Sequence, residues 1–440
     1  MAEGFAAILR DRARLVRVTD GFAVAAVVSL PWSISATNIL LVLALIAFLP
    51  TTDVTSVRRE IMTPAGGLPV LLWALAAVGM LWSDASWNER LAALAGFHKL
   101  LFIPLGLAHF RRSGGGQWII LGFFASSAVL LVASWGLFLI PGLPWRGKAE
   151  AGVVVRDYIA QSGIFAICAL GLLGWGFDLW RSRRTGVALA VVVAAAAFLA
   201  NIVFVATART TIVVIAVLIL LLGYRQFGWK GLIATGLLGG VVGSLAWISS
   251  PYLRERVTGV FEEVHHYSGT EAFLSSAGAR IQFWIKSTGF IADAPVIGHG
   301  TGMTELLFRR GAAGEPETPG LITHNPHNQI LAVAVQLGLV GTTALIAMWI
   351  AHLALFREAT WVSWLGLMIV VQNIISSCFN SHLTDFTQGW IYVLGVGAVG
   401  AMVLPRAPVK GEGINLASGS RLVEEKSYKS FEREGSDQSP

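Results

Sequence analysis

The sequence predicts an all-α protein that crosses a membrane about twelve times. Hydrophobic residues make up 55% of its 440 residues and charged residues only 13%, which is too little charge to cover the surface of a water-soluble protein of this length. The apolar residues fall into twelve stretches suited to membrane helices, which need roughly 20 residues each. One long polar segment, residues 250–326, interrupts them. We expect this segment to form a loop domain of mainly helical character outside the membrane.

The order of these stretches divides the chain into five parts. Residues 1–18 precede the first span, nine spans occupy residues 19–249, the loop domain 250–326 follows, and three more spans occupy residues 327–405. Residues 406–440 are rich in Gly, Ser, Glu and Lys, a composition typical of a disordered tail. The approximate spans are 19–33, 35–50, 67–83, 98–110, 116–140, 159–180, 186–205, 208–224, 229–249, 327–355, 360–379 and 386–405.

Basic residues indicate which side of the membrane each end of a span faces. Short loops that carry Lys and Arg stay in the cytoplasm, and in this chain they alternate with loops that are poor in basic residues. The basic loops contain Arg58 and Arg59, Arg111 and Arg112, Arg181, Arg183 and Arg184, Arg225 and Lys230, Arg357, and Arg406 with Lys410. We therefore predict that both termini are cytoplasmic and that the loop domain lies on the outer face.

Charge distribution and cysteine content exclude two other kinds of protein. The formal net charge is +6, but the basic residues are spread over loop ends instead of clustering with aromatic residues, so we expect no nucleic-acid partner. The two cysteines, Cys168 and Cys378, both lie in apolar stretches, where cysteine acts as a small core residue. We therefore expect no disulfide framework.

The first candidate for chemistry is His327, where the loop domain meets the tenth span. Pro326 suits the first turn of a helix and Asn325 suits its cap, which would place His327 in the opening turn. The helix dipole there would keep the imidazole neutral, as a general base requires, and would favour a phosphate nearby. Offsets of eleven and fourteen residues put Gly338 and Gly341 on the same helix face, leaving a groove below the histidine. The alternative is an interfacial histidine that only forms hydrogen bonds.

Two arginines accompany this histidine. Arg209 stands at the outer start of a span, where an arginine usually faces a cavity or a partner anion; the alternative is snorkelling to the headgroups. Arg280, in the loop domain, has Trp284 one helical turn further on, which favours stacking on the guanidinium, although a solvated loop arginine is an equal alternative. Ile281, Trp284 and Ile285 share a helix face, which we expect to pack on the membrane helices.

Arginines beside lipid indicate a diphosphate ligand, because guanidinium groups bind phosphate oxygens through paired hydrogen bonds. The outer face has no Asp-x-Asp metal motif; its only adjacent acidic residues are Glu262 and Glu263, near His265 and His266. We interpret these four residues as a solvated helix face in preference to a metal site, and expect neither metal nor cofactor. The run Gly298–Gly302 suits a backbone nest for an anion or sugar, although glycine-rich turns are common.

Other outer residues complete the candidate site. His324 is close enough to His327 in sequence to support or replace it. We expect Asn328 and Trp284 to contribute to substrate binding as well. A second outer segment contains Arg156, Tyr158 and Gln161, and a third, Asn380-Ser381-His382-Leu383-Thr384-Asp385, contains His382 and Asp385. A plain polar turn is the alternative interpretation of the third segment.

The spacing around His327 resembles the signature of a known family. His327-Asn328, nine residues, Gly338, two residues and Gly341 match H-[NSQ]-x9-G-x-x-[GTY], the signature of bacterial O-antigen ligases. The twelve predicted spans, with both ends inside and one large outer loop before the motif, also resemble that family over nearly the whole chain. The motif is shared with O-antigen polymerases and protein O-oligosaccharyltransferases.

The resemblance implies a C-type glycosyltransferase fold in the inner membrane of a Gram-negative bacterium. Such enzymes move a finished glycan from undecaprenyl diphosphate to a sugar hydroxyl of lipid A–core on the periplasmic side, in lipopolysaccharide biosynthesis. Family arginines that match Arg209 and Arg280 hold the diphosphate, and the histidine that matches His327 acts on the acceptor. We expect a single inverting displacement without metal. The implied partners are the two lipid-linked substrates and membrane lipids; a monomer is favoured, with the oligomeric state left open.

Three other functions remain open. A polymerase would use a second glycan chain as acceptor, and Arg309 with Gly320 and Arg225 with Gly236 fit a spacing associated with polymerases, as chance allows in a chain with 48 glycines. A protein O-oligosaccharyltransferase usually carries a longer C-terminal region. A secondary transporter would place broken helices and charges at mid-membrane, whereas the polar residues here gather at the outer ends of the spans.

Overall fold

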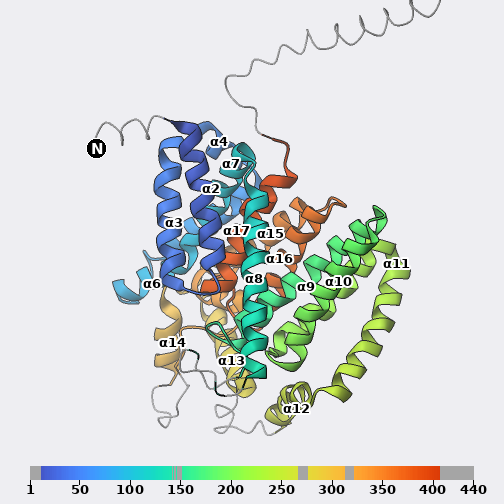
Figure 1. Ribbon diagram of the computed structural model, residues 1–440. Coiled ribbons are helices and arrows are strands. Elements are labelled where there is room, and N and C mark those ends of the chain that lie inside the picture. Colours follow the sequence, from blue (N-terminus) through green and yellow to red (C-terminus); the bar gives the residue numbers. More distant parts are fainter. Residues whose placement is uncertain are drawn as a thin grey trace, which may run out of the picture. The chain divides into compact units, whose positions relative to one another are not determined.

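The computed structural model describes residues 11–140, 142, 145, 151–265, 276–312 and 322–406, without side chains at 260–265 and 276 (Figure 1). Residues up to Pro405 form one compact unit, to which all contacts below belong. The regular elements of the described residues are the helices α2 (Arg12–Ser29), α3 (Ile34–Phe48), α4 (Val54–Ile61), α5 (Pro64–Val78), α6 (Trp87–His98), α7 (Phe102–Ser113), α8 (Gly116–Leu139), α9 (Tyr158–Arg181), α10 (Thr185–Phe204), α11 (Arg209–Ser249), α12 (Pro251–His265), α13 (Ser276–Asp293), α14 (Met303–Gly311), α15 (Gln329–Leu355), α16 (Trp361–Ser377) and α17 (Phe386–Val403), with the 3₁₀ turns η1 (Leu49–Thr51) and η2 (Lys99–Leu101). The predicted all-α class is confirmed. The predicted tail lies outside the described residues from residue 407 onward.

Eight of the described spans are long and apolar enough to cross a membrane. Helices α4 and α5, bent by 85° relative to each other, make a ninth if they are taken as one span. The chain is therefore a polytopic membrane protein, but helix length and apolarity do not confirm the predicted number of twelve spans. One reason is that α16 has only 17 residues. Another is that α11, with 41 residues, contains two of the predicted spans.

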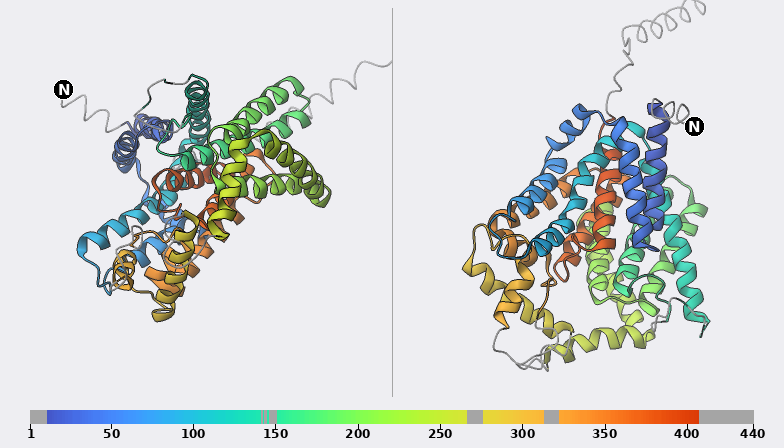
Figure 2. Two further views of the ribbon diagram at one scale, coloured as in Figure 1. Left: turned by 90° about the horizontal axis from the view of Figure 1, so that it is seen from below. Right: turned by 90° about the vertical axis from the view of Figure 1, so that its left-hand side faces the viewer.

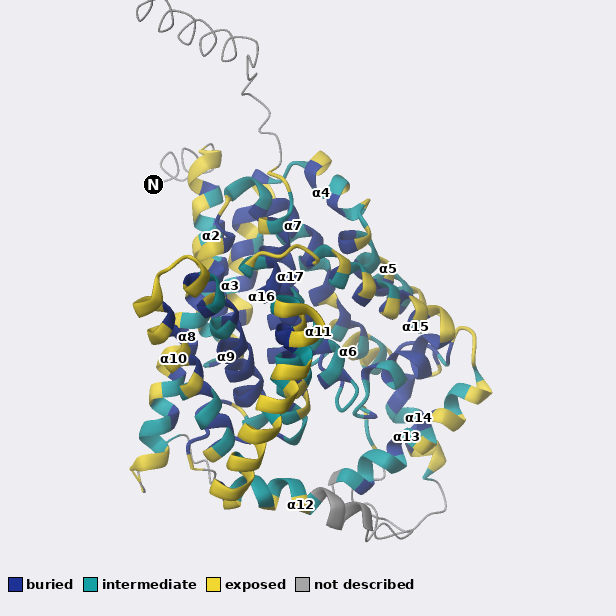
Figure 3. Cartoon of the chain, turned by 90° about the vertical axis from the view of Figure 1, so that its right-hand side faces the viewer, coloured by how far each residue is buried: buried dark blue, intermediate teal, exposed yellow. Residues whose placement is uncertain are grey.

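Helix α11 reverses direction at Gly228, where φ is 61° and ψ is −146°. The residues on either side of this turn approach closely: a Cβ on Gly223 would overlap the side chain of Thr235, and one on Gly231 would overlap the carbonyl oxygen of Gly223. The two arms of α11 therefore lie side by side, as the predicted spans 208–224 and 229–249 require. The second arm exposes a row of apolar side chains, as a lipid-facing helix would (Figure 3): Leu237, Val241, Leu245 and Ile248.

The core lies around α9 and α17. Of their apolar stretches, 72% and 78% are buried, against 28–50% for the other candidate spans. Helix α17 packs on α7 and α16, and α9 packs on α10, α11 and α16. Glycines permit the closest approach, because a Cβ on Gly106 of α7 would lie 3.2 Å from the Cα of Gly397 on α17. The ends of α9, α16 and α17 are thus rigid supports for the residues that follow or precede them.

The polar segment that was predicted to be helical contains α12, α13 and α14. These three helices lie at one end of the membrane helices, and α4 with the start of α2 lies at the other (Figures 1 and 2). At the α4 end, buried Glu60 binds Arg111 at 2.5 Å and Arg59 at 3.1 Å. This end carries the arginine pairs from which the cytoplasmic side is predicted, so the segment with α12–α14 belongs to the opposite face.

Candidate active site

The sequence predicted that His327 lies in the first turn of α15. It lies instead in the turn before that helix, which begins at Gln329. Its φ is 54°, a left-handed conformation that residues other than glycine rarely adopt. The cap of α15 is Asn328, whose Oδ1 accepts the backbone N–H of Ile330 at 2.9 Å and of Leu331 at 3.1 Å. Asn325, the predicted cap, instead accepts the backbone N–H of His327 at 2.8 Å. Both asparagines are suitable cap residues, but Asn328 is extended and directly precedes the helix, so it is the cap.

A hydrogen-bond network fixes the tautomer of His327. Its Nδ1 lies 3.0 Å from Oδ1 of Asn380. The same oxygen accepts the backbone N–H of Ser381 at 2.9 Å and Nδ2 of Asn325 at 2.9 Å. Because a backbone N–H can only donate, this atom is the amide oxygen and His327 Nδ1 carries the proton. In the neutral ring, Nε2 therefore keeps its lone pair.

Helix α13 packs against the imidazole. The ring of Phe283 stacks on that of His327, with centroids 6.1 Å apart and planes inclined by 23°, and Phe283 is only 5% exposed. Burial lowers the pKa of His327, the positive charge of Arg280 lowers it further, and the hydrogen bond with Asn380 opposes the shift. The exposed His324 has a smaller effect in the same direction as Arg280. The ring is therefore neutral at neutral pH, with a cation close by.

The buried face of α13 differs from the predicted one. Phe283 and Ser287, four residues apart, are buried, whereas Ile285 is 56% exposed. Ile281 and Trp284 are half-buried, and Trp284 Nε1 has no hydrogen-bond partner among the described residues. The prediction chose the helix face that carries Ile281, Trp284 and Ile285. In the structure the face with Phe283 packs toward α14 and α15. The stacking of Trp284 on Arg280 stays a prediction.

His382 shares the electrostatic surroundings of His327. It is 3% exposed, and burial lowers its pKa to about 4 against the opposing charges of Asp385 and Asp157. The charges of Arg280 and His327 act in the same direction as burial. Its Nδ1 is buried without a hydrogen-bond partner among the described residues. His382, in the predicted third outer segment, therefore has both Asp157 before α9 and the His327–Arg280 pair in its electrostatic surroundings.

Arg209 is the first residue of α11, as predicted. Its Nε donates to the carbonyl oxygen of Arg256 on α12 at 2.8 Å, so the arginine is held by the segment that follows its own helix hairpin. The next two residues, Thr210 and Thr211, line a cavity of about 10 Å³ together with His382. Arg209 thus approaches the polar region from the α11 side, and Arg280 approaches it from the α13 side.

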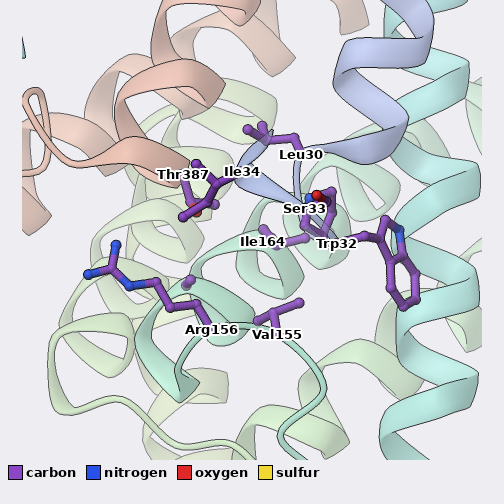
Figure 4. Close-up of a pocket in the computed structure, with 10 residues that line it drawn as sticks. Leu30, Trp32, Ser33, Ile34, Val155, Arg156, Ile164 and Thr387 are labelled. Atoms are coloured by element: carbon purple, nitrogen blue, oxygen red, sulfur yellow. The ribbon is translucent and has the colours of Figure 1, made fainter. Parts of the chain in front are cut away.

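The second outer segment joins the third through Arg156. This side chain is 61% exposed and lies 3.8 Å from Asp385 and 3.9 Å from Asp157. It also lines a cavity of about 260 Å³ (Figure 4). The guanidinium of Arg256 lies over the ring of Tyr158, 4.7 Å from its centroid. Arg256 belongs to α12, and its carbonyl oxygen accepts the hydrogen bond from Arg209. The predicted residues of these segments therefore surround one region, although they are far apart in sequence.

Two predicted substrate-binding residues are structural in the observed arrangement. Gln161 has no exposed surface; its Oε1 accepts the N–H of Val154 at 2.9 Å, and its Nε2 donates to the carbonyl of Gly152 and to Ser134 Oγ, both at 3.0 Å. Asn328 caps α15, and its Nδ2 donates to the carbonyl of Cys378 at 3.1 Å. Both amides are fully engaged within the protein, so they shape loops and do not face a substrate.

Gly338 of the motif forms a break in α15 and not a groove below His327, and Gly341 lies in the helix after the break. Gly338 has φ 59° and ψ −155°, so the helix face of His327 does not continue past it. Residues 295–300 fill the gap in the helical hydrogen bonds. Their bonds are Leu339 N–H to Pro295 O (2.9 Å), Val340 N–H to Val296 O (3.1 Å), His299 N–H to Val335 O (3.0 Å) and Gly300 N–H to Gln336 O (2.9 Å).

The same contacts revise the predicted anion nest at residues 298–302. The N–H groups of His299 and Gly300 are bonded to α15, and that of Gly302 donates to Gln336 Oε1 at 2.9 Å. A Cβ on Gly338 would overlap the backbone of Val296. The glycines at both places allow two backbones to meet, and the N–H groups of this run are not available to a ligand.

Metal binding was predicted to be absent. Among the residues that the structure describes, no three His, Cys, Asp or Glu side chains are grouped as a metal site. The side chains of Glu262, Glu263, His265 and His266, as well as Gly320 of the alternative polymerase spacing, lie outside the described residues. These interpretations remain predictions.

Sequence reasoning missed two residues that shape the site. Asn380 sits in the third outer segment, which was noted for His382 and Asp385, and an asparagine two residues before a histidine carries no local signal for a contact 53 residues away. Phe283 is three residues after Arg280 and so lies on the same side of a helix. That spacing was a usable signal for Phe283.

Comparison with known proteins gives two matches. Residues 194–346 match a family model described as O-antigen ligase; this range contains Arg209, Arg280, His327, Gly338 and Gly341. The chain is also 28% identical over 178 residues to an uncharacterized protein of Haemophilus influenzae. That match covers 37% of this chain and 45% of the Haemophilus protein, so it spans less than half of the relative.

Proposed function

We propose that this chain, whose residues 194–346 match a family model described as O-antigen ligase, transfers a glycan from undecaprenyl diphosphate to a sugar hydroxyl of lipid A–core. The reaction takes place on the outer face of the inner membrane, with both termini in the cytoplasm. One observation carries the proposal: a neutral imidazole, oriented by Asn380, lies beside the cation of Arg280 in the family's matched region.

In this proposal His327 is the general base. Asn380 holds the proton on Nδ1, which leaves Nε2 to accept the proton of the acceptor hydroxyl. Burial and Arg280 keep the pKa of His327 below its ordinary value, so the base is unprotonated at the pH of the periplasm. Such a base contributes roughly 10²–10⁴-fold to the rate.

Arg280 and Arg209 stabilise the leaving group. The acceptor oxygen attacks the anomeric carbon from the side opposite the diphosphate, the bond from that carbon to the diphosphate oxygen breaks, and the configuration inverts. The electron pair leaves on undecaprenyl diphosphate, whose charge the two guanidinium groups neutralise. The proton goes to His327 Nε2. The step balances without metal or cofactor.

The remaining outer residues bind the substrates. His324, exposed beside His327, and Trp284 on α13 contact the acceptor side. Arg156, Tyr158, His382 and Asp385 belong to the opposite side, where α9 and α17 begin. Gly338 and Gly341 keep the loop domain in register with α15 and contact neither substrate.

The test is complementation of a Gram-negative strain that lacks its ligase, with the lipopolysaccharide ladder read on a gel. The wild-type gene restores the ladder, and alanine at His327, Arg280 or Arg209 abolishes it while the protein stays in the membrane. Arg310→Gln is the matched control, because this arginine is exposed and its ion pair among the described residues is with exposed Asp84. The purified reaction continues in the presence of a chelator.

Other outcomes of the same test identify the rival functions. If the gene restores glycan length but not attachment to lipid A–core, the protein is a polymerase. If the glycan appears on proteins, it is a protein O-oligosaccharyltransferase. If alanine at His327 leaves the ladder intact, the proposed base is wrong.

A further inference from the structure

A cavity of about 260 Å³ lies beside the candidate site, where the α2–α3 junction meets the starts of α9 and α17 (Figure 4). Its wall is largely apolar, formed by side chains such as Leu30, Ile34 and Ile164. Arg156 supplies the one charged group among its lining residues. The cavity therefore combines a cation with a hydrocarbon surface, the combination that an amphiphile requires.

A second cavity of about 40 Å³ continues the first toward the middle of the helices. Its lining is apolar throughout, and Leu30 belongs to both cavities. On each of three helices the lining moves by one helical turn from the first cavity to the second. These pairs are Leu30, the C-cap of α2, and Val27 on α2, Ile164 and Ile167 on α9, and Thr387 and Ile391 on α17. The two cavities are thus stacked along the helices, and we call them together the α2–α9 slot.

The size of the slot limits what can enter it. At ~30 Å³ for each water-sized group, the larger cavity holds on the order of nine such groups, and the smaller one adds little. A single narrow chain fits this space, whereas several acyl chains side by side do not. The occupant is therefore a one-chain lipid with an anionic head at Arg156.

The charges around Arg156 leave it able to bind an anion. Its distances of 3.8 Å to Asp385 and 3.9 Å to Asp157 exceed hydrogen-bond length. Both carboxylates cap helices instead: Asp157 Oδ1 accepts the N–H of Ala160 at 2.7 Å, and Asp385 Oδ1 accepts that of Gln388 at 3.2 Å. Guanidinium N–H groups remain for phosphate oxygens, to which they bind in pairs.

We propose that the α2–α9 slot seats the first isoprene units of the lipid donor, with the diphosphate at its mouth beside Arg156. The inference rests on the proposed function, because that function supplies a donor with one long chain and a diphosphate. Arg156 lies 3.8 Å from Asp385, and Asn380 in the same outer segment lies 3.0 Å from His327, the neighbour of Arg280. The diphosphate therefore passes from Arg156 toward Arg280, and the acceptor approaches from the α13 side.

The test measures binding to the purified full chain in detergent. The probes are farnesyl diphosphate, a short one-chain diphosphate, and inorganic diphosphate, which has no chain. Ile34→Trp narrows the slot at a side chain that is 46% exposed, and Ile39→Trp on the same helix, 60% exposed and outside both cavities, is its control. Ile34→Trp weakens the binding of farnesyl diphosphate roughly tenfold or more, because several methylene groups of the ligand lose buried contacts. The affinity for inorganic diphosphate stays unchanged in Ile34→Trp. In Ile39→Trp the affinities for both probes stay unchanged.

Arg156→Gln is the second variant. It weakens the binding of both probes, because the diphosphate of each needs the guanidinium cation. Equal binding of farnesyl diphosphate to wild type, Ile34→Trp and Arg156→Gln overturns the inference. So does displacement of farnesyl diphosphate by phosphatidylglycerol vesicles at equal lipid concentration, since the slot would then hold bulk lipid. Binding requires no glycan transfer, so a chain that fails to restore the ladder but binds farnesyl diphosphate in the slot contradicts the proposed function alone.

Discussion

Helices α11 and α15 are built alike but held differently. Each starts at a candidate active-site residue, Arg209 for α11 and His327 just before α15, and each breaks at the first glycine of a G-x-x-G sequence. The backbone is nearly the same at both breaks, with φ 61° and ψ −146° at Gly228 and φ 59° and ψ −155° at Gly338. A Cβ on Gly228 would meet nothing within 4 Å, whereas one on Gly338 would overlap the backbone of Val296.

The difference shows that one local turn serves two purposes. In α11 the turn joins the two arms of a hairpin. Gln226 and Phe227 beside it contact Arg181 and Phe177 of α9, but Gly228 itself has space for a Cβ. In α15 it is bonded to residues 295–300, and the same outer segment carries Phe283, which stacks on His327. The loop domain therefore holds α15 both at its break and at its histidine. Gly338 of the signature thus joins α15 to the loop domain that carries Arg280.

Substituting each break glycine with alanine is the strongest test of this comparison. Gly338→Ala adds strain to a left-handed backbone and pushes Val296 away, so we expect a loss of stability of about 3 kcal/mol or more and no detectable transfer. Gly228→Ala has only the backbone strain, about 1–3 kcal/mol, and keeps its activity. Thermal unfolding of the purified proteins and the lipopolysaccharide ladder measure the two effects. Equal losses at both glycines would show that the packing around Gly338 is unimportant.

The two arginines offer the next test. In the proposed reaction, Arg280→Gln and Arg209→Gln each remove a cation from the leaving group, and we expect kcat to fall by roughly 10²–10³-fold in both. Of the two arginines, Arg280 is the one whose charge is among the causes that lower the pKa of His327. Removing it raises that pKa toward the ordinary value, so the pH at which activity is lost on acidification moves upward in Arg280→Gln. An unchanged acid limb in Arg280→Gln, or the same shift in Arg209→Gln, would contradict the observed placement.

The same two helices show what a sequence reveals. The start of α11 at Arg209 and the hairpin arms were predictable, because apolar length and charge are local properties. The cap of α15 was wrongly placed at Asn325, since both asparagines suit a cap by residue type and their tertiary bonds, Asn325 to Asn380 and Asn328 to Cys378, cannot be read from the sequence. Gln161 was misinterpreted for a related reason: its partners Ser134 and Gly152 are reached only after folding.

Asn380 permits a test with a smaller effect on rate. Asn380→Asp keeps an acceptor at His327 Nδ1 but gives it a negative charge, which stabilises the imidazolium and raises the pKa of His327. Activity should then be lost at a higher pH on acidification, while the rate on the alkaline plateau stays within roughly tenfold of wild type, because the base is still oriented. Asn380→Leu is the contrast: it removes the acceptor, frees the tautomer and lowers the plateau without raising the acid limb. Identical pH profiles for the two variants would exclude Asn380 as the residue that orients the base.

The cap of α15 has the smallest expected effect. Helix α11 starts without a side-chain cap at Ala208, whereas Asn328 accepts two backbone N–H groups at the start of α15. Asn328→Ala should lower the free energy of unfolding by about 1 kcal/mol, and activity should fall only a few-fold, because Asn325 and Asn380 still hold His327. Asn328→Ser retains a capping oxygen and should recover most of the stability but not the bond to Cys378. If serine restores stability and not activity, the tie between the ends of α15 and α16 also positions the histidine.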